Sequence, residues 1–197
     1  MTSSTPAPRH DTDVAVVGGG PAGLQAALTV ARVHRRVTLF DDGRYRNATV
    51  AHMHNVASHD GTPPAQFRAT ARAELAAYDT VELREQRVDS VETMEGGGVR
   101  LTATDGSVLT AATVVLATGL RDELPDVDGL AELWGDLVAA CPFCHGHEAA
   151  GRRVGILGAA AAPHQSRLLA PVAGRLVVLP HEDDAPTDLP EIGRAHV

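Results

Sequence analysis

Lysine is absent from the chain, and cysteine and aromatic residues are scarce. All 17 basic residues are arginine, against 25 acidic residues, and the net charge is −8. An acidic chain with 3% aromatic residues has neither the basic surface nor the stacking rings of a typical nucleic-acid-binding protein, so no nucleic-acid partner is expected. No run of 18 apolar residues occurs, so the sequence predicts no membrane span and no membrane partner.

The only two cysteines are Cys141 and Cys144. Residues 1–11 contain no apolar segment of a secretory signal, so we expect a disordered tail there and a cytoplasmic protein. In such a chain, two cysteines at CxxC spacing favour a redox pair or half of a metal site over a structural crosslink. A pair at this spacing can close and reopen by thiolate exchange, which passes two electrons at a time.

A glycine-rich turn near the N-terminus separates a predicted strand, Asp13–Val17, from a predicted helix, Leu24–Arg32. Its glycines fill the G-x-G-x-x-G positions at which backbone N–H groups and a helix N-terminus bind a pyrophosphate. The predicted cofactor-binding residues of this turn are Gly18, Gly20, Pro21, Ala22 and Gly23. A second strand, Val37–Phe40, leads to Asp41 at the distance expected for a ribose-binding carboxylate. A buried βαβ unit without a ligand is the alternative interpretation.

The middle of the chain predicts a helix over residues 63–78 and then a small antiparallel β-meander. The meander is assigned to four short β runs, Val81–Leu83, Arg87–Val91, Val99–Ala103 and Val108–Thr110. A separate apolar strand, Thr113–Leu116, follows it. In a doubly wound α/β sheet the residues after such a strand face the ligand crevice, which adds Ala117, Thr118 and Gly119 to the predicted cofactor site.

The last part of the chain predicts a second strand–turn–helix unit. A strand over 153–157 precedes a turn at Gly158, and a helix over 164–173 and a strand over 175–179 follow. Aligned on Gly158, Ala160 and Pro163 replace the second and third glycines, and a Cβ at the middle position obstructs a pyrophosphate. The acidic residues 182–184 include no arginine for a 2′-phosphate. NADPH binding is therefore doubtful.

These features together resemble the low-molecular-weight thioredoxin reductases. Four stretches resemble more closely the thioredoxin-reductase-like dithiol oxidases that close disulfides in microbial metabolites of the gliotoxin and holomycin kind: Tyr45–Asn47, His52–Val56, Ala117–Pro125 and Cys141–Glu148. The resemblance implies a doubly wound FAD-binding domain, FAD as cofactor, a small-molecule dithiol as substrate, oxygen as acceptor and a homodimer. It adds four residues to the predicted cofactor site: Arg46, Asn47, His54 and Asn55.

The resemblance also implies roles for the cysteines. Cys141 forms the mixed disulfide with the dithiol, and Cys144 passes electrons to FAD, which oxygen reoxidises. His145 stands where thioredoxin reductases carry an acid, and an imidazole there can accept a thiol proton and stabilise the neighbouring thiolate. His147 is a second candidate for that role. Alternatively, both histidines are solvated loop residues.

The implied division places an FAD-binding domain at 12–124 and a partial nucleotide domain with CxxC at 125–191. Nothing in the chain matches the segment that completes the family's FAD domain, so we expect a truncated chain, and we interpret 192–197 as an artefactual tail. Three other functions are considered. They are an NADPH-dependent thioredoxin reductase, a flavin-fold protein without turnover, and a zinc module built from Cys141, Cys144, His145 and His147. We predict no metal, because neighbouring residues such as Cys144 and His145 fit one tetrahedral site poorly.

Overall fold

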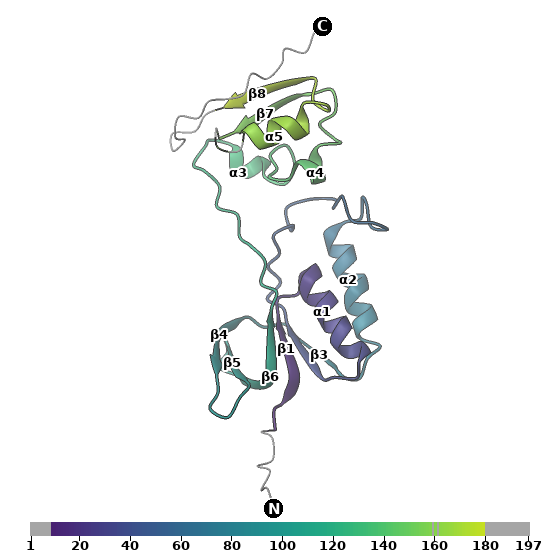
Figure 1. Ribbon diagram of the computed structural model, residues 1–197, viewed down its shortest axis with the longest axis vertical. Helices are drawn as coiled ribbons and strands as arrows, with labels where there is room; N and C mark the ends of the chain where they lie inside the picture. Colours follow the sequence, from purple (N-terminus) through teal and green to yellow (C-terminus); the bar gives the residue numbers. More distant parts are fainter. Residues whose placement is uncertain (1–8, 159, 161, 180–197) are drawn as a thin grey trace, which may run out of the picture. The chain divides into compact units, whose positions relative to one another are not determined.

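The computed structural model describes residues 9–158, 160 and 162–179 (Figure 1). The predicted N-terminal tail up to residue 8, the acidic residues 182–184 and the tail 192–197 lie outside the described residues. The helices and strands are β1 (Thr12–Val17), α1 (Pro21–Arg32), β2 (Val37–Phe40), α2 (Pro64–Leu75), β3 (Val81–Arg84), β4 (Val88–Thr93), β5 (Val99–Ala103), β6 (Val108–Leu116), α3 (Leu130–Leu133), α4 (Pro142–His145), β7 (Arg153–Leu157), α5 (Ala162–Leu169) and β8 (Arg175–Leu179).

The described residues divide into two units. The first takes its residues from Met1–Ala51 and Pro63–Pro125, and the second from His52–Thr62 and Asp126–Val197. The short segment His52–Thr62 therefore belongs with the cysteines and not with the sequence around it, which differs from the linear division predicted at residue 124.

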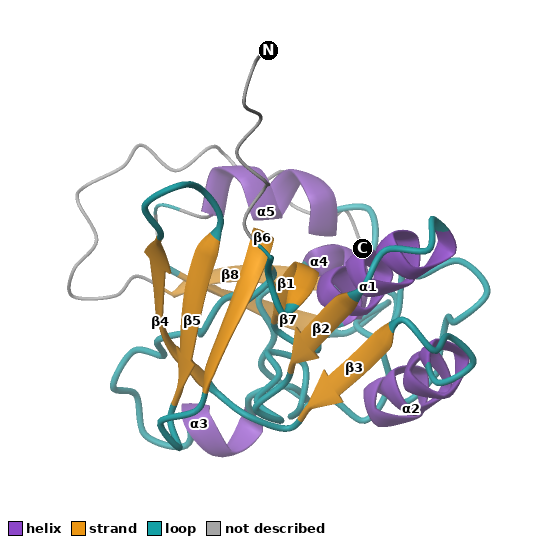
Figure 2. Ribbon diagram, turned by 90° about the horizontal axis from the view of Figure 1, so that it is seen from below, coloured by secondary structure: helices purple, strands orange, loops and turns teal. Residues whose placement is uncertain are grey.

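The first unit is built on a six-stranded sheet with the order β3-β2-β1-β6-β5-β4 (Figure 2). Strands β3, β2, β1 and β6 are parallel neighbours, whereas β5 and β4 continue the sheet in antiparallel pairing. All four residues of β2 are buried, as expected for a continuous apolar strand inside a parallel sheet. The predicted α/β fold with a doubly wound, Rossmann-like first half is confirmed.

Two of the strand predictions were wrong. Val81–Leu83 does not belong to the antiparallel meander, because β3 pairs in parallel with β2 through Val37↔Val81 and Leu39↔Leu83. The predicted strands 108–110 and 113–116 are one strand, β6. Its first half pairs with β5 and its second half with β1, and Ala111 pairs on both sides. The short apolar runs in the sequence do not reveal which strands pair with each other in the sheet.

Helix α1 packs one apolar face on the sheet. Leu24 and Ala27 of α1 are buried against Val16 and Leu39, and Leu75 at the end of α2 completes this cluster. A second cluster contains Ala15, Phe40, Leu101, Leu109 and Ala111, from the central strands and the antiparallel part of the sheet. Alternate residues of β1 enter the two clusters, because successive side chains of a strand point to opposite faces. The carboxyl ends of β1, β2 and β6 are thereby held at one edge.

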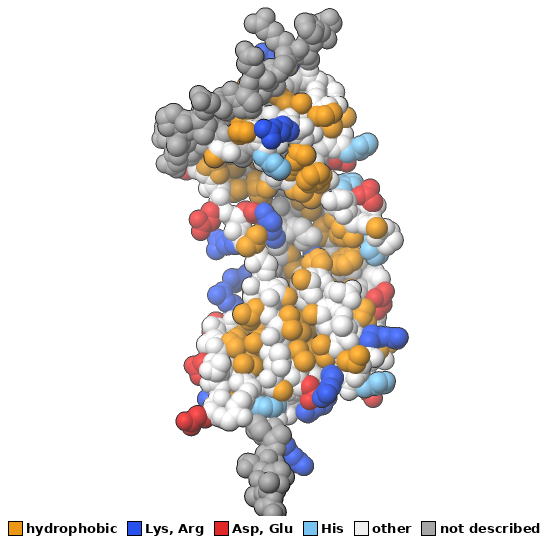
Figure 3. Space-filling view, in the orientation of Figure 1, with side chains coloured by type: hydrophobic (Ala, Val, Ile, Leu, Met, Phe, Trp, Pro, Cys, Tyr) orange, Lys and Arg blue, Asp and Glu red, His pale blue; other side chains and the backbone are white. Residues whose placement is uncertain are grey.

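In the second unit, β7 and β8 pair in parallel, and α5 lies between them in the chain. Ile156 of β7 packs with Ala162 and Leu169 of α5. The predicted second strand–turn–helix–strand is therefore present. Hydrophobic side chains also reach the surface of both units (Figure 3), among them Leu116 of the first and Leu137 of the second. No described helix is long and apolar enough to cross a membrane.

Candidate active site

The glycine turn between β1 and α1 is shaped by close backbone contacts. Gly18 has φ +114°, a conformation that side-chain-bearing residues rarely adopt, and a Cβ there would collide with the Ala117 carbonyl. A Cβ on Gly23 would collide with the Gly18 carbonyl, so the third glycine lets the helix approach the strand. A Cβ on Gly20 would meet nothing within 4 Å. The backbone of the turn is therefore closely packed at Gly18 and Gly23, whereas the space next to the Gly20 Cα atom is open.

The N-terminus of α1 is suited to an anion. Gly20 is its N-cap, Pro21 occupies its first turn, no side chain caps it and no acidic residue lies in that turn. Its free N–H groups and positive dipole end are therefore not neutralised locally. Ala22 and Gly23 continue this turn. A pyrophosphate group fits the open space at Gly20 in chemistry and in room, so the residues predicted to hold the FAD phosphates fit that group.

The residues after β6 lie against the same turn. Ala117 donates its N–H to the Val17 carbonyl at 2.8 Å, and Gly18 donates to the Phe40 carbonyl at 2.8 Å. Thr118 and Gly119 are exposed, and Gly119 has φ +68°. The structure thus brings together the turn, Asp41 after β2 and the Ala117–Gly119 segment, three stretches that lie far apart in the sequence.

Asp41 is buried, and its carboxylate is engaged inside the protein. It accepts hydrogen bonds from the Gly43 N–H at 3.0 Å, the Tyr45 hydroxyl at 2.7 Å and the Arg72 guanidinium at 2.6 Å. Burial opposes ionisation, but these three donors together hold the pKa of Asp41 below its ordinary value. Burial and the carboxylate raise the pKa of Tyr45. Asp41 therefore anchors its own loop, and its predicted contact with a ribose stays a prediction.

The predicted cofactor residues Arg46 and Asn47 belong to the same loop. Arg46 makes two hydrogen bonds to the Asp122 carboxylate, at 2.8 and 2.7 Å, which lower the pKa of Asp122. Asn47 accepts a hydrogen bond from Arg68 at 3.1 Å, and the Arg68 guanidinium lies 3.7 Å from the centre of the Tyr45 ring. Arg68 and Arg72 of α2 therefore contact the loop that follows β2 and stabilise its conformation. The sequence pattern of α2 did not predict these contacts.

Cys141 and Cys144 form a disulfide at the start of α4, with their Cα atoms 5.3 Å apart. Pro142 begins the helix, where its missing N–H is not needed. A Cβ on Gly146 would collide with the Pro142 carbonyl, so the residue after His145 must be small for the chain to turn so tightly. One short turn of helix therefore explains both features: it brings the two cysteines together, and it requires a small residue at Gly146.

The side chains around this disulfide differ in exposure. His145 is partly buried, and its Nδ1 atom has no hydrogen-bond partner among the described residues, whereas His147 is exposed. The predicted role of His145 as a proton acceptor stays a prediction. Phe143, between the two cysteines, has 65% of its surface exposed. The exposure of this ring could not be predicted from the sequence, because an aromatic residue between two cysteines is equally compatible with a buried position.

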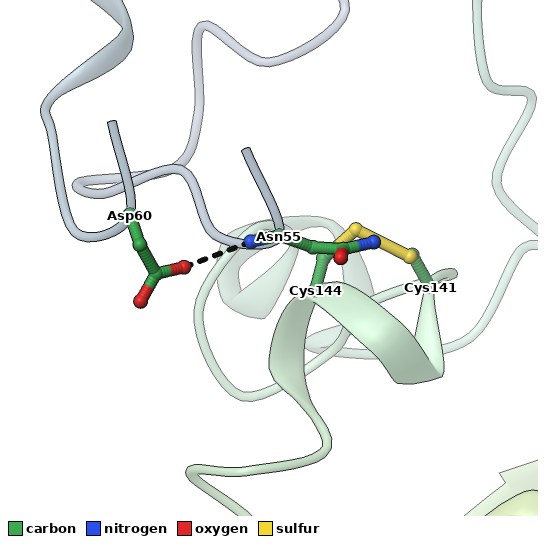
Figure 4. Close-up of a disulfide and its surroundings, with 4 residues drawn as sticks. All are labelled: Asn55, Asp60, Cys141 and Cys144. Carbon is green, nitrogen blue, oxygen red and sulfur yellow. Dashed lines mark hydrogen bonds between the residues drawn. A yellow bond between two sulfur atoms is a disulfide. The ribbon is translucent and has the colours of Figure 1, made fainter. Parts of the chain in front are cut away.

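His54 and Asn55 lie in the unit that contains the disulfide. Their segment is closed by two 2.9 Å hydrogen bonds, from Met53 N–H to the Thr62 carbonyl and from Gly61 N–H to the Met53 carbonyl. Asn55 has φ +61°, which asparagine tolerates better than most residues. Its N–H donates to Asp60 at 2.9 Å, and both residues belong to the surroundings of the disulfide (Figure 4). The role of His54 and Asn55 in cofactor binding stays a prediction.

The described residues contain no group of three or more histidine, cysteine, aspartate or glutamate side chains arranged to hold a metal ion. Cys141 and Cys144 are joined to each other, and a disulfide sulfur is not the thiolate that binds zinc. The arrangement supports thiol–disulfide exchange.

A family model of the pyridine nucleotide-disulphide oxidoreductases matches residues 12–162, which include the glycine turn and the disulfide. The chain belongs to this family. Among the curated members, a probable thioredoxin reductase of Arthroderma benhamiae is 40% identical over 156 residues, which are 77% of this chain and 39% of that protein. Thioredoxin reductase aclD of Aspergillus oryzae is 41% identical over 165 residues, 79% of this chain and 52% of that protein.

A solved structure has the same fold. The crystal structure of HlmI superposes with a TM-score of 0.84 and 38% identity, over 91% of this chain and 58% of HlmI. The chain spans about half the length of the two curated relatives, 39% and 52%. The predicted membership of a thioredoxin-reductase-like family of oxidoreductases is confirmed, and this membership favours FAD as the cofactor.

Proposed function

We propose that the protein oxidises a small-molecule dithiol to a disulfide, using Cys141–Cys144 as the immediate oxidant, FAD as the electron carrier and oxygen as the final acceptor. The observation that carries the proposal is the Cys141–Cys144 disulfide at the start of α4, with the partly buried ring of His145 next to Cys144 in the same helix. An oxidised pair can accept electrons only from a thiol or another reductant, and a partly buried imidazole supplies a proton acceptor.

The exchange balances in two steps. A substrate thiolate attacks one cysteine sulfur, an S–S bond forms to the substrate, and the other cysteine leaves as a thiolate. The second substrate thiolate then attacks the substrate sulfur of this mixed disulfide and releases the second cysteine. The substrate disulfide and the reduced cysteine pair are the products, and two thiol protons have been transferred. By resemblance, Cys141 carries the mixed disulfide and Cys144 faces the flavin.

The remaining residues bind and orient the carrier. When bound, FAD would supply a two-electron acceptor for the reduced cysteines. The α1 N-terminus at Gly20 would hold its pyrophosphate, and Asp41 anchors the loop beside this glycine turn through the Tyr45 hydroxyl. We further propose a cytoplasmic location and a homodimer, both as the resemblance implies.

An NADPH-dependent thioredoxin-disulfide reductase is the second candidate. It is favoured by the names of the curated relatives, thioredoxin reductases, and by the βαβ arrangement of β7, α5 and β8. Ala160, at the position of the second glycine, is exposed, and its Cβ stands where a pyrophosphate needs to approach the backbone. This substitution is why we rank the dithiol oxidase first.

The flavin spectrum and the dithiol turnover of the expressed protein separate the two candidates. The oxidase proposal predicts a yellow protein that consumes a small dithiol in air with one peroxide formed per disulfide. It also predicts that NADPH added without air leaves the flavin spectrum unchanged. Rapid bleaching by NADPH together with no turnover of dithiols would instead identify the reductase. A Cys144→Ser variant is the control, because it retains the flavin sites but cannot cycle a disulfide.

A further inference from the structure

A histidine from a distant part of the sequence lies between two carboxylates in the disulfide-bearing unit. His54 Nδ1 is 3.4 Å from the Asp60 carboxylate, and His54 Nε2 is 3.7 Å from the Glu148 carboxylate. Glu148 follows Cys144 by four residues, in the turns after α4. The contact between the His54 ring and the Glu148 carboxylate therefore connects the segment His52–Thr62 with the loop that carries the disulfide.

The segment holds this histidine in a defined place. Asp60 Oδ1 contacts the His54 ring and also accepts a hydrogen bond from the Asn55 N–H at 2.9 Å. One carboxylate therefore orients both the His54 side chain and the backbone of Asn55. The His54 side chain is 27% exposed, against 69% for Asp60 and 47% for Glu148. The imidazole is thus the most shielded member of the group but is still open to solvent and solutes. Asn55 and Asp60 belong to the surroundings of the disulfide (Figure 4).

The chemistry of this disulfide calls for more than one proton acceptor. Conversion of a dithiol to a disulfide releases two thiol protons for each pair of electrons that the cysteines accept. His145 can take one of them. An imidazole between two carboxylates is a second candidate acceptor, because the carboxylates on either side orient the ring.

We propose that His54, oriented by Asp60 and Glu148, is a second proton acceptor for thiols that react with the Cys141–Cys144 disulfide. This inference rests on the proposed thiol–disulfide exchange but not on its direction or on oxygen. Glu148 is a positioning residue that acts through the His54 ring. Two further titratable side chains of the disulfide loop, His145 and His147, stay in place in the variants below.

The test is a single reduction of the disulfide, without flavin turnover. The protein is mixed with dithiothreitol in the absence of air, stopped by alkylation at set times, and the free thiols are counted by mass spectrometry. His54→Gln is expected to slow the reduction at pH 6.5 by at least about tenfold, because general-base catalysis is lost. At pH 9.5 the deficit is expected to shrink to about twofold or less, because ordinary thiols ionise unaided above about pH 8.5.

Three comparisons make the result decisive. Glu148→Gln, a change at an exposed side chain, is expected to give a smaller loss at pH 6.5 and no further loss when combined with His54→Gln. His164→Gln, at an exposed histidine of α5 in the same unit, is expected to match the wild type. Equal rates for His54→Gln and wild type, or an equal deficit at both pH values, would overturn the proposal. If His54→Gln does not fold, a Glu148→Gln rate equal to wild type at pH 6.5 would overturn it as well.

The proposed function can fail separately. A complete protein that never oxidises dithiols in air leaves the reduction of Cys141–Cys144 measurable, and the pH-dependent deficit of the variants is then still expected. Conversely, dithiol oxidation in air with no pH-dependent deficit would reject His54 alone.

Discussion

The Arg72 guanidinium of α2 lies 2.6 Å from the buried carboxylate of Asp41, at the carboxyl end of β2. The second nitrogen of its fork pairs with Glu85 at 2.9 Å, so one arginine spans the end of the sheet. Asp41 would otherwise be a buried charge with two neutral donors. The ion pair explains how a carboxylate is tolerated at this depth, beside the glycine turn.

Replacement of Arg72 by methionine is expected to lower the free energy of unfolding by about 2–3 kcal/mol. This is less than the full cost of leaving a buried charge unpaired, because the Gly43 and Tyr45 hydrogen bonds to Asp41 remain. Urea unfolding at pH 7 measures it. Arg100→Met, at an exposed site on β5, is the control and is expected to change stability by less than about 0.5 kcal/mol. Equal effects of the two changes would contradict the assignment.

The stability that Asp41 contributes is expected to depend on pH. Its pKa is lowered in the folded protein, so the contribution is fully present above the ordinary carboxyl pKa of about 3.9 and is lost as the pH falls through the lower folded value. The difference in unfolding free energy between wild type and Asp41→Asn is therefore constant from pH 7 to pH 5 and declines below pH 4. Urea titrations over this range check it. A difference that grows on acidification would show that the sign is wrong.

The glycine turn predicts different effects for an alanine at Gly20 and an alanine at Gly23. Gly23→Ala is expected to cost about 1–3 kcal/mol of stability, because its Cβ collides with the Gly18 carbonyl. Gly20→Ala is expected to change stability by no more than about 1 kcal/mol, because its Cβ points into open space and only the N-cap preference is lost. The same Gly20→Ala change is expected to release flavin from the protein made from the complete gene. Thermal unfolding and the flavin retained after gel filtration distinguish the two.

The Arg46–Asp122 pair is expected to contribute little to stability. The Arg46 side chain is 48% exposed, and ion pairs of this kind contribute about 1 kcal/mol or less. A double-mutant cycle with Arg46→Gln and Asp122→Asn measures the coupling, which is expected to fall further in 1 M salt. A coupling well above this range would mean that the pair is held more rigidly than its exposure implies.

The local geometry of the glycine turn and of the cysteine pair could be read from the sequence, because each depends on residues that are close together in the chain. Gly18, Gly20 and Gly23 lie where the G-x-G-x-x-G spacing predicts, since the turn is defined by contacts within a few residues and with the adjacent strand. Cys141 and Cys144 could be recognised as a redox pair because one helical turn brings CxxC sulfurs within reach. The α/β class followed from the order of apolar runs.

Pairing between distant segments could not be read in the same way. Val81–Leu83 has the same apolar character whether it pairs with β2 or with a meander, so only the folded sheet decided its neighbour. Asp41 has the spacing of a ribose ligand, but the sequence does not reveal that Arg72 and Tyr45 would engage its carboxylate.

The sequence by itself determined a glycine turn suited to a pyrophosphate and an exchangeable cysteine pair, because both chemistries lie within single short stretches. Only the tertiary structure placed His54 with Glu148 in the disulfide-bearing unit, although the two residues lie 94 positions apart in the sequence. The reason is physical. Side-chain contacts between distant segments depend on the course of the whole backbone between them, and this course cannot be derived from the types of the contacting residues alone.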